Sequence, residues 1–129
     1  MNLLLDTHTF LWFVNDDSRL SQFHKNLIEN ESNDSYLSLA SLWEMSIKYN
    51  LGKLRLEPSY EDFVKKEVNG SNVILLAIKL EHIKANASLP FYHRDPFDRI
   101  IIAQSMTENI PIITLDVVFK QYSVELIDG

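Results

Sequence analysis

Five carboxylates stand at positions in the sequence where they would act together. Asp6 and Asp116 each end a short apolar run, and Glu44 stands beside the apolar side of a predicted helix. Asp95 and Asp98 stand at the first turn of another predicted helix. Several carboxylates in one crevice must be neutralised, either by raised pKa values or by a bound cation.

The ligand chemistry of this set favours a hard divalent ion. The chain contains no cysteine and offers no pair of histidines at metal-ligand spacing, so the donors are oxygens. Oxygen donors favour Mg²⁺ or Mn²⁺ over zinc, and Mg²⁺ is usually held by one or two carboxylates together with substrate phosphate. The acids therefore predict one or two Mg²⁺ or Mn²⁺ ions and phosphate chemistry, in which one ion activates an attacking water and a second stabilises the leaving oxygen.

Each acid also has an ordinary structural explanation. Asp6 and Asp116 would simply end strands. Glu44 would form an exposed i, i+4 ion pair with Lys48, worth a few tenths of a kcal/mol. For Asp95 we favour helix capping, because proline follows it at the first helical position. The combination of acids, rather than any one of them, favours a site.

The elements that must position the acids alternate between strands and helices. Predicted strands cover 3–5, 36–38, 73–76, 111–115 and 124–127, and predicted helices cover 7–14, 21–30, 39–50, 60–68, 79–87, 96–106 and 117–121. This order predicts an α/β fold, with a central parallel sheet of about four to five strands flanked by helices. The crevice of such a sheet lies beyond the carboxyl ends of its strands, where Asp6 and Asp116 fall.

Composition sets limits on the class of protein. The 129 residues predict one domain spanning 1–129, and 18 acidic against 12 basic residues give a net charge of -6. This balance argues against broad capture of nucleic acid by a basic surface. The absence of cysteine excludes a disulfide framework and fits a cytoplasmic location. The longest apolar run, 73–78, is far below the roughly 18–20 residues of a membrane span, and we expect neither a membrane segment nor a signal peptide.

Four segments resemble the successive signatures of the PIN-domain family, with the closest similarity to VapC-type toxins of bacterial toxin–antitoxin pairs. They read LLDTHTFLW at 4–12, SLWEMSIK at 41–48, HRDPFDR at 93–99 running into IAQ at 102–104, and TLD at 114–116. They occur in the family's order and extend over nearly the whole chain.

The resemblance implies a function and a set of partners. It implies a Mg²⁺- or Mn²⁺-dependent endoribonuclease, the toxin of a type II pair, that hydrolyses RNA phosphodiester bonds. Asp6, Glu44, Asp98 and Asp116 match the family's catalytic acids, which hold the metal. The resemblance also implies a homodimer and a cognate antitoxin, a segment of which occupies the acidic groove.

Four further residues are candidate supporting groups. The hydroxyls of Thr7 and Thr114 would join the water shell of the metal, or else form ordinary hydrogen bonds at strand ends. Asp95 would be a fifth acid at the rim. Arg99 would pair with an acid or contact the RNA backbone.

Basic residues near the acids are candidate RNA contacts. His93 and Arg94 precede the Asp95 cap in a loop expected to border the crevice, although a solvated loop explains them equally well. Lys48, with Lys53 and Arg55, would guide a phosphate backbone toward Glu44, although a solvated face is the simpler explanation. Aromatic residues such as Trp12 and Trp43 are expected in the core, which we favour, or at a dimer interface, rather than as surfaces on which bases stack.

Two other functions remain open from the residues alone. A receiver-like phosphoacceptor domain is also an acidic α/β domain, but it would need paired acids after the first strand, where Thr7 and His8 follow Asp6. A non-catalytic binding or scaffold domain would keep the fold and the metal without turnover. Mn²⁺ titration combined with a cleavage assay separates the scaffold from the nuclease.

Overall fold

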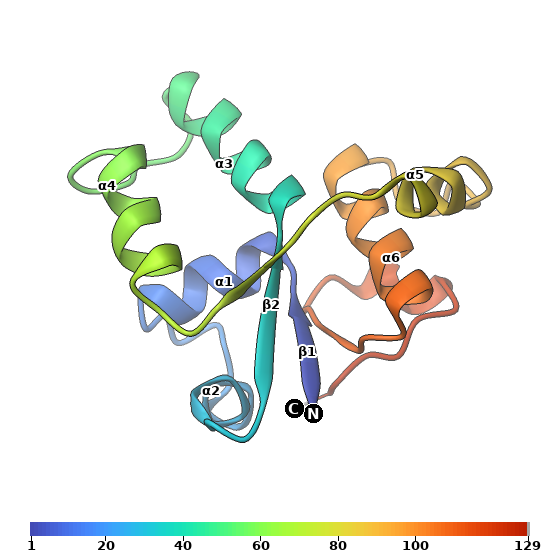
Figure 1. Ribbon diagram of the computed structural model, residues 1–129, viewed down its shortest axis with the longest axis horizontal. Coiled ribbons are helices and arrows are strands. Elements are labelled where there is room, and N and C mark those ends of the chain that lie inside the picture. The colour runs from blue at the N-terminus through green and yellow to red at the C-terminus, as the bar shows by residue number, and fades with distance from the viewer. Residues whose placement is uncertain (129) are drawn as a thin grey trace.

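A four-stranded parallel sheet forms the centre of the computed structural model, which describes residues 1–128 and leaves residue 129 of the predicted domain outside the described range. The strand order is β3-β2-β1-β4, and every pair is parallel. The strands are β1 (Asn2–Leu5), β2 (Asp34–Ser38), β3 (Ile74–Leu76) and β4 (Ile112–Ile113). The predicted α/β class is confirmed (Figure 1).

A helix begins within four residues of the end of each strand, and further helices complete the connections to the next strand. They are α1 (Thr7–Val14), α2 (Gln22–Glu29), α3 (Leu39–Asn50), α4 (Tyr60–Val64) with the π-helical turn η1 (Lys65–Asn69), α5 (Leu80–Ala87), α6 (Pro96–Glu108) and the 3₁₀ helix η2 (Val117–Gln121). Helix α3 ends where predicted, and Gly52 then takes the left-handed φ of 74° that follows many helix ends. Within residues 1–128, no helix has the length and apolarity needed to cross a membrane.

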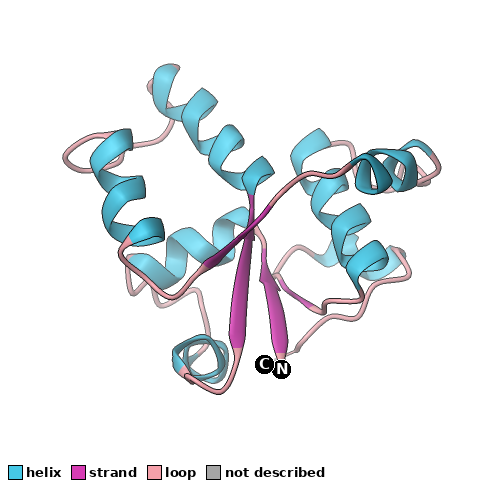
Figure 2. Ribbon diagram, in the orientation of Figure 1, coloured by secondary structure: helices cyan, strands magenta, loops and turns pink. Residues whose placement is uncertain are grey.

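Two separate cores cover the two faces of the sheet, because successive side chains of a strand point to opposite faces. Leu3 and Leu5 of β1 pack in one core with Phe10 of α1. Leu4, between them, packs in the other core with Ile101 of α6. Helices α1 to α4 lie on one side of the sheet and α5 and α6 on the other (Figure 2). Because the strands are parallel, the carboxyl ends of β1, β2 and β4 lie at the same edge of the sheet.

The last two predicted strands are shorter than expected. Instead of covering 111–115, β4 ends at Ile113, because the Thr114 hydroxyl accepts a hydrogen bond from the backbone N–H of Asp116 and the chain turns. The predicted strand at 124–127 is wrong. Only one bridge forms there, Ile112 with Leu126, since the two-residue β4 offers no longer edge.

A candidate acidic metal centre

Two aspartates at strand ends act as helix caps, each through its Oδ1. Asp6, directly after β1, accepts a hydrogen bond at Oδ1 from the backbone N–H of Thr9 at 2.8 Å. Asp116, after β4, accepts one at Oδ1 from Val118 at 3.0 Å. Because β1 and β4 are neighbours in a parallel sheet, both carboxylates stand at the same edge. The Oδ2 of each carboxylate has a further partner, which is the Thr114 hydroxyl for Asp6 and His93 Nε2 for Asp116.

The Thr114 hydroxyl joins these two residues. It donates to Oδ2 of Asp6 and accepts from the backbone N–H of Asp116 at 3.0 Å. Asp6 is almost completely buried, so this hydroxyl orients a carboxylate that has little contact with water. Of the two roles predicted for Thr114, the structure contains the strand-end hydrogen bond.

Glu44 of α3 is buried beside the end of β1. Its Oε1 accepts a hydrogen bond from the Thr7 hydroxyl at 2.7 Å, and that hydroxyl also lies 2.9 Å from the Ser41 hydroxyl. Its Oε2 lies 2.6 Å from Nζ of Lys48. The predicted i, i+4 pair is present, but its description as exposed is wrong, because the Glu44 side chain is only 3% exposed.

His93 lies among the acids, although the sequence suggested only a weak RNA contact. Its Nδ1 accepts the backbone N–H of Asp95 at 3.1 Å, so in the neutral ring Nε2 carries the proton. That Nε2 lies 2.7 Å from Oδ2 of Asp116 and 3.1 Å from Oδ2 of Asp98. His93 therefore links the carboxylates of α6 and η2 as a hydrogen-bond donor.

Asp98 of α6 experiences the negative field of the whole cluster. Burial first, and repulsion by neighbouring carboxylates second, raise the pKa of Asp98 from 3.8 to about 8. The repelling neighbours are Asp95, Asp6, Glu44 and Asp116. The topology thus brings together all five acids that the sequence predicted, from four separate segments of the chain.

Lys48 is the cation at the edge of this cluster. Its hydrogen bond with Glu44 raises the pKa of Lys48, and the charges of Asp95 and Asp98 raise it further. One partly exposed ammonium group cannot neutralise two buried carboxylates, Asp6 and Glu44, and three half-buried ones. The oxygen donors and their uncompensated charge therefore fit a divalent cation, and the hard oxygen set fits Mg²⁺ or Mn²⁺.

Arg99 does not pair with the acids in this structure. Its buried guanidinium donates to the backbone carbonyl oxygens of Leu89, Pro90 and His93 at 2.9–3.2 Å. The Tyr122 hydroxyl assists by accepting the backbone N–H of His93 at 2.8 Å. These groups position the loop that carries His93. Arg94 in the same loop is exposed.

The sequence reasoning gave no role to Tyr122 or Ser41, and it treated Trp43 as core. Trp43 is 59% exposed and packs edge-on against Phe97, with ring centroids 5.1 Å apart. The expectation that Trp43 is buried is wrong. Helical periodicity predicts which residues lie on the same side of a helix, but it does not predict whether that side is covered. In α3, part of the apolar side is exposed.

Asp95 offers the first test, since its capping role is visible. Its Oδ1 accepts the backbone N–H groups of Phe97 and Asp98 at 2.8 and 3.3 Å. We expect Asp95→Ala to lower the free energy of unfolding by about 1 kcal/mol, because two donors of the first turn lose their acceptor. Asp95→Ser should restore most of it. Urea unfolding measures both, and an Ala variant as stable as the wild type would contradict the capping role.

The fold and the site together define a class of protein, an α/β domain with an acidic centre at the carboxyl end of a parallel sheet. The PIN domain family model matches residues 3–125. The chain therefore belongs to the PIN domain family. No curated protein sequence matches the chain.

Solved structures of the same fold share little sequence with the chain. VapBC2 from Rickettsia felis bound to a DNA fragment from its promoter gives a TM-score of 0.72 at 16% identity, over 99% of this chain and 98% of that one. DNA-bound VapBC from Salmonella typhimurium gives 0.70 at 14%, over 99% and 97%. FitAcB from Neisseria gonorrhoeae gives 0.65 at 16%, over 98% and 96%.

Proposed function

We propose that the chain is a metal-dependent endoribonuclease of the VapC type, the toxin of a toxin–antitoxin pair. The observation that carries the proposal is the meeting of Asp6, Glu44, Asp98 and Asp116 at one sheet edge, where burial and the neighbouring carboxylates raise the pKa of Asp98. Membership of the PIN domain family and the fold shared with VapBC and FitAcB structures support it. RNA is the proposed substrate.

Asp6, Glu44, Asp98 and Asp116 would hold one or two Mg²⁺ or Mn²⁺ ions. Such ions activate water and stabilise the leaving oxygen of a phosphodiester. The chain's own contribution is orientation. The hydroxyls of Thr7 and Thr114 hold Glu44 and Asp6, so these carboxylates do not have to reorganise when substrate arrives.

His93 has a positioning role in this proposal rather than a ligand role. Its Nδ1 is occupied by the N–H of Asp95, so Nε2 presents a proton rather than a lone pair to Asp98 and Asp116. The same bonds align the two carboxylates across the crevice. An RNA contact by His93 or Arg94 is a further part of the proposal.

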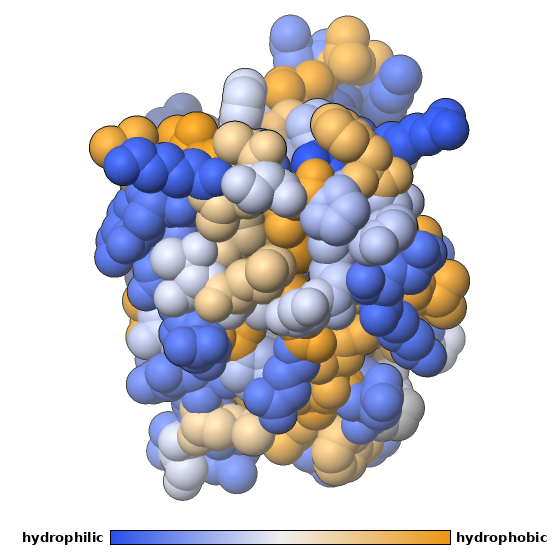
Figure 3. Space-filling model, turned by 90° about the vertical axis from the view of Figure 1, so that its right-hand side faces the viewer, coloured by the Kyte–Doolittle hydropathy of each residue, from blue (hydrophilic) through white to orange (hydrophobic). Residues whose placement is uncertain are grey.

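The proposed partners are an antitoxin and a second copy of the chain. The neighbours VapBC2 and FitAcB support an antitoxin. Exposed apolar residues repeat every four positions along α3 and its C-cap, which suits a homodimer: they are Leu39, Trp43, Ile47 and Leu51. On the side of the molecule that carries α5 and α6, apolar and hydrophilic side chains are intermixed (Figure 3). A cytoplasmic location, which the absence of cysteine favours, belongs to the same proposal.

Metal binding gives a test that does not depend on knowing the RNA target. With Mn²⁺ at ten times its Kd, we expect the free energy of unfolding to rise by about 1.4 kcal/mol, because the ion binds only the folded cluster. The same ion should permit cleavage of pooled RNA, and EDTA should abolish both effects. Mn²⁺ binding without cleavage, in protein freed of any antitoxin, would support the scaffold alternative instead.

A further inference from the structure

A cavity lies at the amino edge of the sheet, the edge opposite to the acidic centre. It has a volume of about 670 Å³ and lies between the carboxyl ends of α1 and α2, the start of β2 and the segment that follows η1. Figure 1 shows α2 beside the start of β2, whereas α3, which carries Glu44, follows the other end of the same strand. We call this the α1–α2 cavity. Its volume is in the range of sites for small organic molecules.

The hydroxyl of Ser35 points into the α1–α2 cavity. Side chains two residues apart in a strand point to the same face, so Ser35 shares the face of Leu37, which packs in the core with Phe10 of α1. Ser35 lines the cavity and is only 6% exposed, and its Oγ has no hydrogen-bond partner within residues 1–128. A buried hydroxyl without a partner costs free energy, which a ligand that hydrogen-bonds to it would recover.

The wall of the α1–α2 cavity combines apolar and acidic side chains. Phe13, Ile28 and Val73 line it and also pack against the core on that face of the sheet. Glu29 and Glu31 line it as well, and neither takes part in an ion pair found among residues 1–128. No basic residue of the described chain lines the cavity. A ligand that fits this wall carries positive charge on an apolar frame.

Two helix ends add negative potential at the same place. The carboxyl end of a helix carries partial negative charge, which cationic groups stabilise. Phe13 is the last residue but one of α1, and Glu29 is the last residue of α2. Neither α1, over residues 7–14, nor α2, over residues 22–29, has a basic residue in its last turn. Both helix ends therefore favour a cation bound in the cavity.

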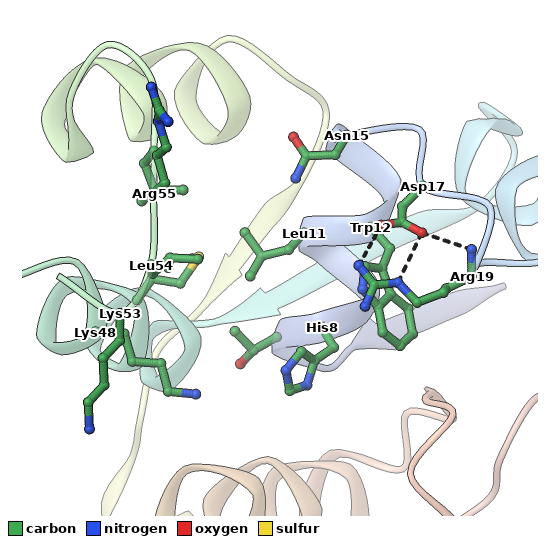
Figure 4. Close-up of a pocket in the computed structure, with 13 residues that line it drawn as sticks. His8, Leu11, Trp12, Asn15, Asp17, Arg19, Lys48, Lys53, Leu54 and Arg55 are labelled. Atoms are coloured by element: carbon green, nitrogen blue, oxygen red, sulfur yellow. Dashed lines mark hydrogen bonds and ion pairs between the residues drawn. The ribbon is translucent and has the colours of Figure 1, made fainter.

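A second cavity beside α1 has the opposite charge. It has a volume of about 300 Å³, lies between α1 and the end of α3, and is lined by four cationic residues against one acidic residue, Asp17 (Figure 4). The four are Arg19, Lys48, Lys53 and Arg55. They would repel a cationic ligand, so we expect such a ligand to select the α1–α2 cavity of the two.

We propose that the α1–α2 cavity binds an aliphatic polyamine, a chain of methylene groups that carries several ammonium groups. The methylene groups lie against Phe13, Ile28 and Val73. One ammonium group donates to Oγ of Ser35, and the others pair with Glu29 and Glu31. An ammonium group has three N–H donors and no acceptor, so it suits hydroxyl and carboxylate oxygens. This site is separate from the acidic centre and does not depend on the proposed nuclease activity.

Calorimetric titration of the full-length protein with spermidine tests the cavity. Salt at about 150 mM screens unspecific attraction to the net charge of -6. Glu29→Gln with Glu31→Gln should raise Kd about 10-fold, because two charge-assisted hydrogen bonds are lost. The matched control, Glu61→Gln with Asp62→Asn, removes the same charge from exposed positions of α4 and should leave Kd unchanged. Asp98→Asn should also leave Kd unchanged, because Asp98 belongs to the other edge of the sheet.

Ser35→Ala gives a second measurement that distinguishes a ligand contact from a structural serine. Without ligand, this variant should melt at or above the temperature of the wild type, because an unpaired buried hydroxyl is removed. It should bind spermidine about 5-fold more weakly, because one charge-assisted hydrogen bond is lost.

Three results would overturn the inference. The first is equal spermidine affinity in the wild type and in the variant with Glu29→Gln and Glu31→Gln. The second is a lower melting temperature of Ser35→Ala with unchanged spermidine affinity. The third is binding of a lysine-rich peptide, but not of spermidine, that depends on Glu29 and Glu31, since the cavity would then be a docking site for a protein.

Discussion

Replacing Asp98 by Asn is expected to lower the rate of RNA cleavage by more than about 100-fold while leaving the protein folded. Changing a residue that only orients a metal ligand typically costs 10- to 100-fold, and a ligand in direct contact should cost more. Asp98 is partly buried and is repelled by four other carboxylates, so a bound cation would stabilise its charge. After Asp98→Asn, the side chain carries no charge and would bind that cation more weakly.

The measurement is the initial cleavage rate in Mn²⁺, with circular dichroism to monitor folding. The matched control is Asp62→Asn, which removes the same charge from an exposed position of α4 that is not part of the acidic cluster. Full activity in Asp98→Asn, with Asp6→Asn also active, would show that the acidic centre is not the site of hydrolysis.

Without metal, Asp98→Asn is expected to stabilise the folded protein at high pH. The folded-state pKa of Asp98 is raised from 3.8 to about 8, so the folded protein binds a proton that the unfolded chain has released between roughly pH 4 and 8. Asp98 therefore costs stability as pH rises through that window. In EDTA, Asp98→Asn should melt above the wild type at pH 8 and close to it at pH 4. A constant difference between the two proteins at all pH values would contradict this linkage.

Arg99→Met is expected to lower the free energy of unfolding by about 2–4 kcal/mol. Met fills a similar volume but donates no hydrogen bonds, so the carbonyl oxygens of Leu89 and His93 lose their side-chain donor in a partly buried region, and the Pro90 carbonyl keeps only the Tyr122 hydroxyl. The Arg99 guanidinium also lies over the Phe91 ring, 4.0 Å from its centroid, and that contact is lost as well.

Urea unfolding of Arg99→Met and Arg94→Met compares a buried arginine with an exposed one on either side of the Asp95 cap. Arg94→Met should change stability by less than about 0.5 kcal/mol. Because Arg99 positions the loop that carries His93, its variant should also bind Mn²⁺ more weakly. If Arg99→Met were as stable as the wild type and lost only RNA affinity, Arg99 would be an RNA contact rather than a residue that holds the loop.

The local sequence was sufficient for most of the elements and for the acids of the site. The apolar run before Asp6 and the Asp95-Pro96 helix start predicted β1 and α6, because strand burial and helix capping depend on neighbouring residues. The alternation of strands and helices then placed Asp6 and Asp116 at one edge, since parallel strands must all end on the same side.

Only the tertiary structure decided how the acids are held and what lies beside them. His93 contacts Asp116, 23 positions away, and Thr114 contacts Asp6, 108 positions away. The α1–α2 cavity likewise combines the ends of two helices with the start of β2. Such contacts depend on how the helices pack on the sheet and on the direction that each side chain takes. Neither can be obtained from the periodicity of a local sequence. Residue type and order therefore determined which acids meet, and packing determined that Glu44 is buried, that Arg99 holds a loop and that the hydroxyl of Ser35 faces a cavity.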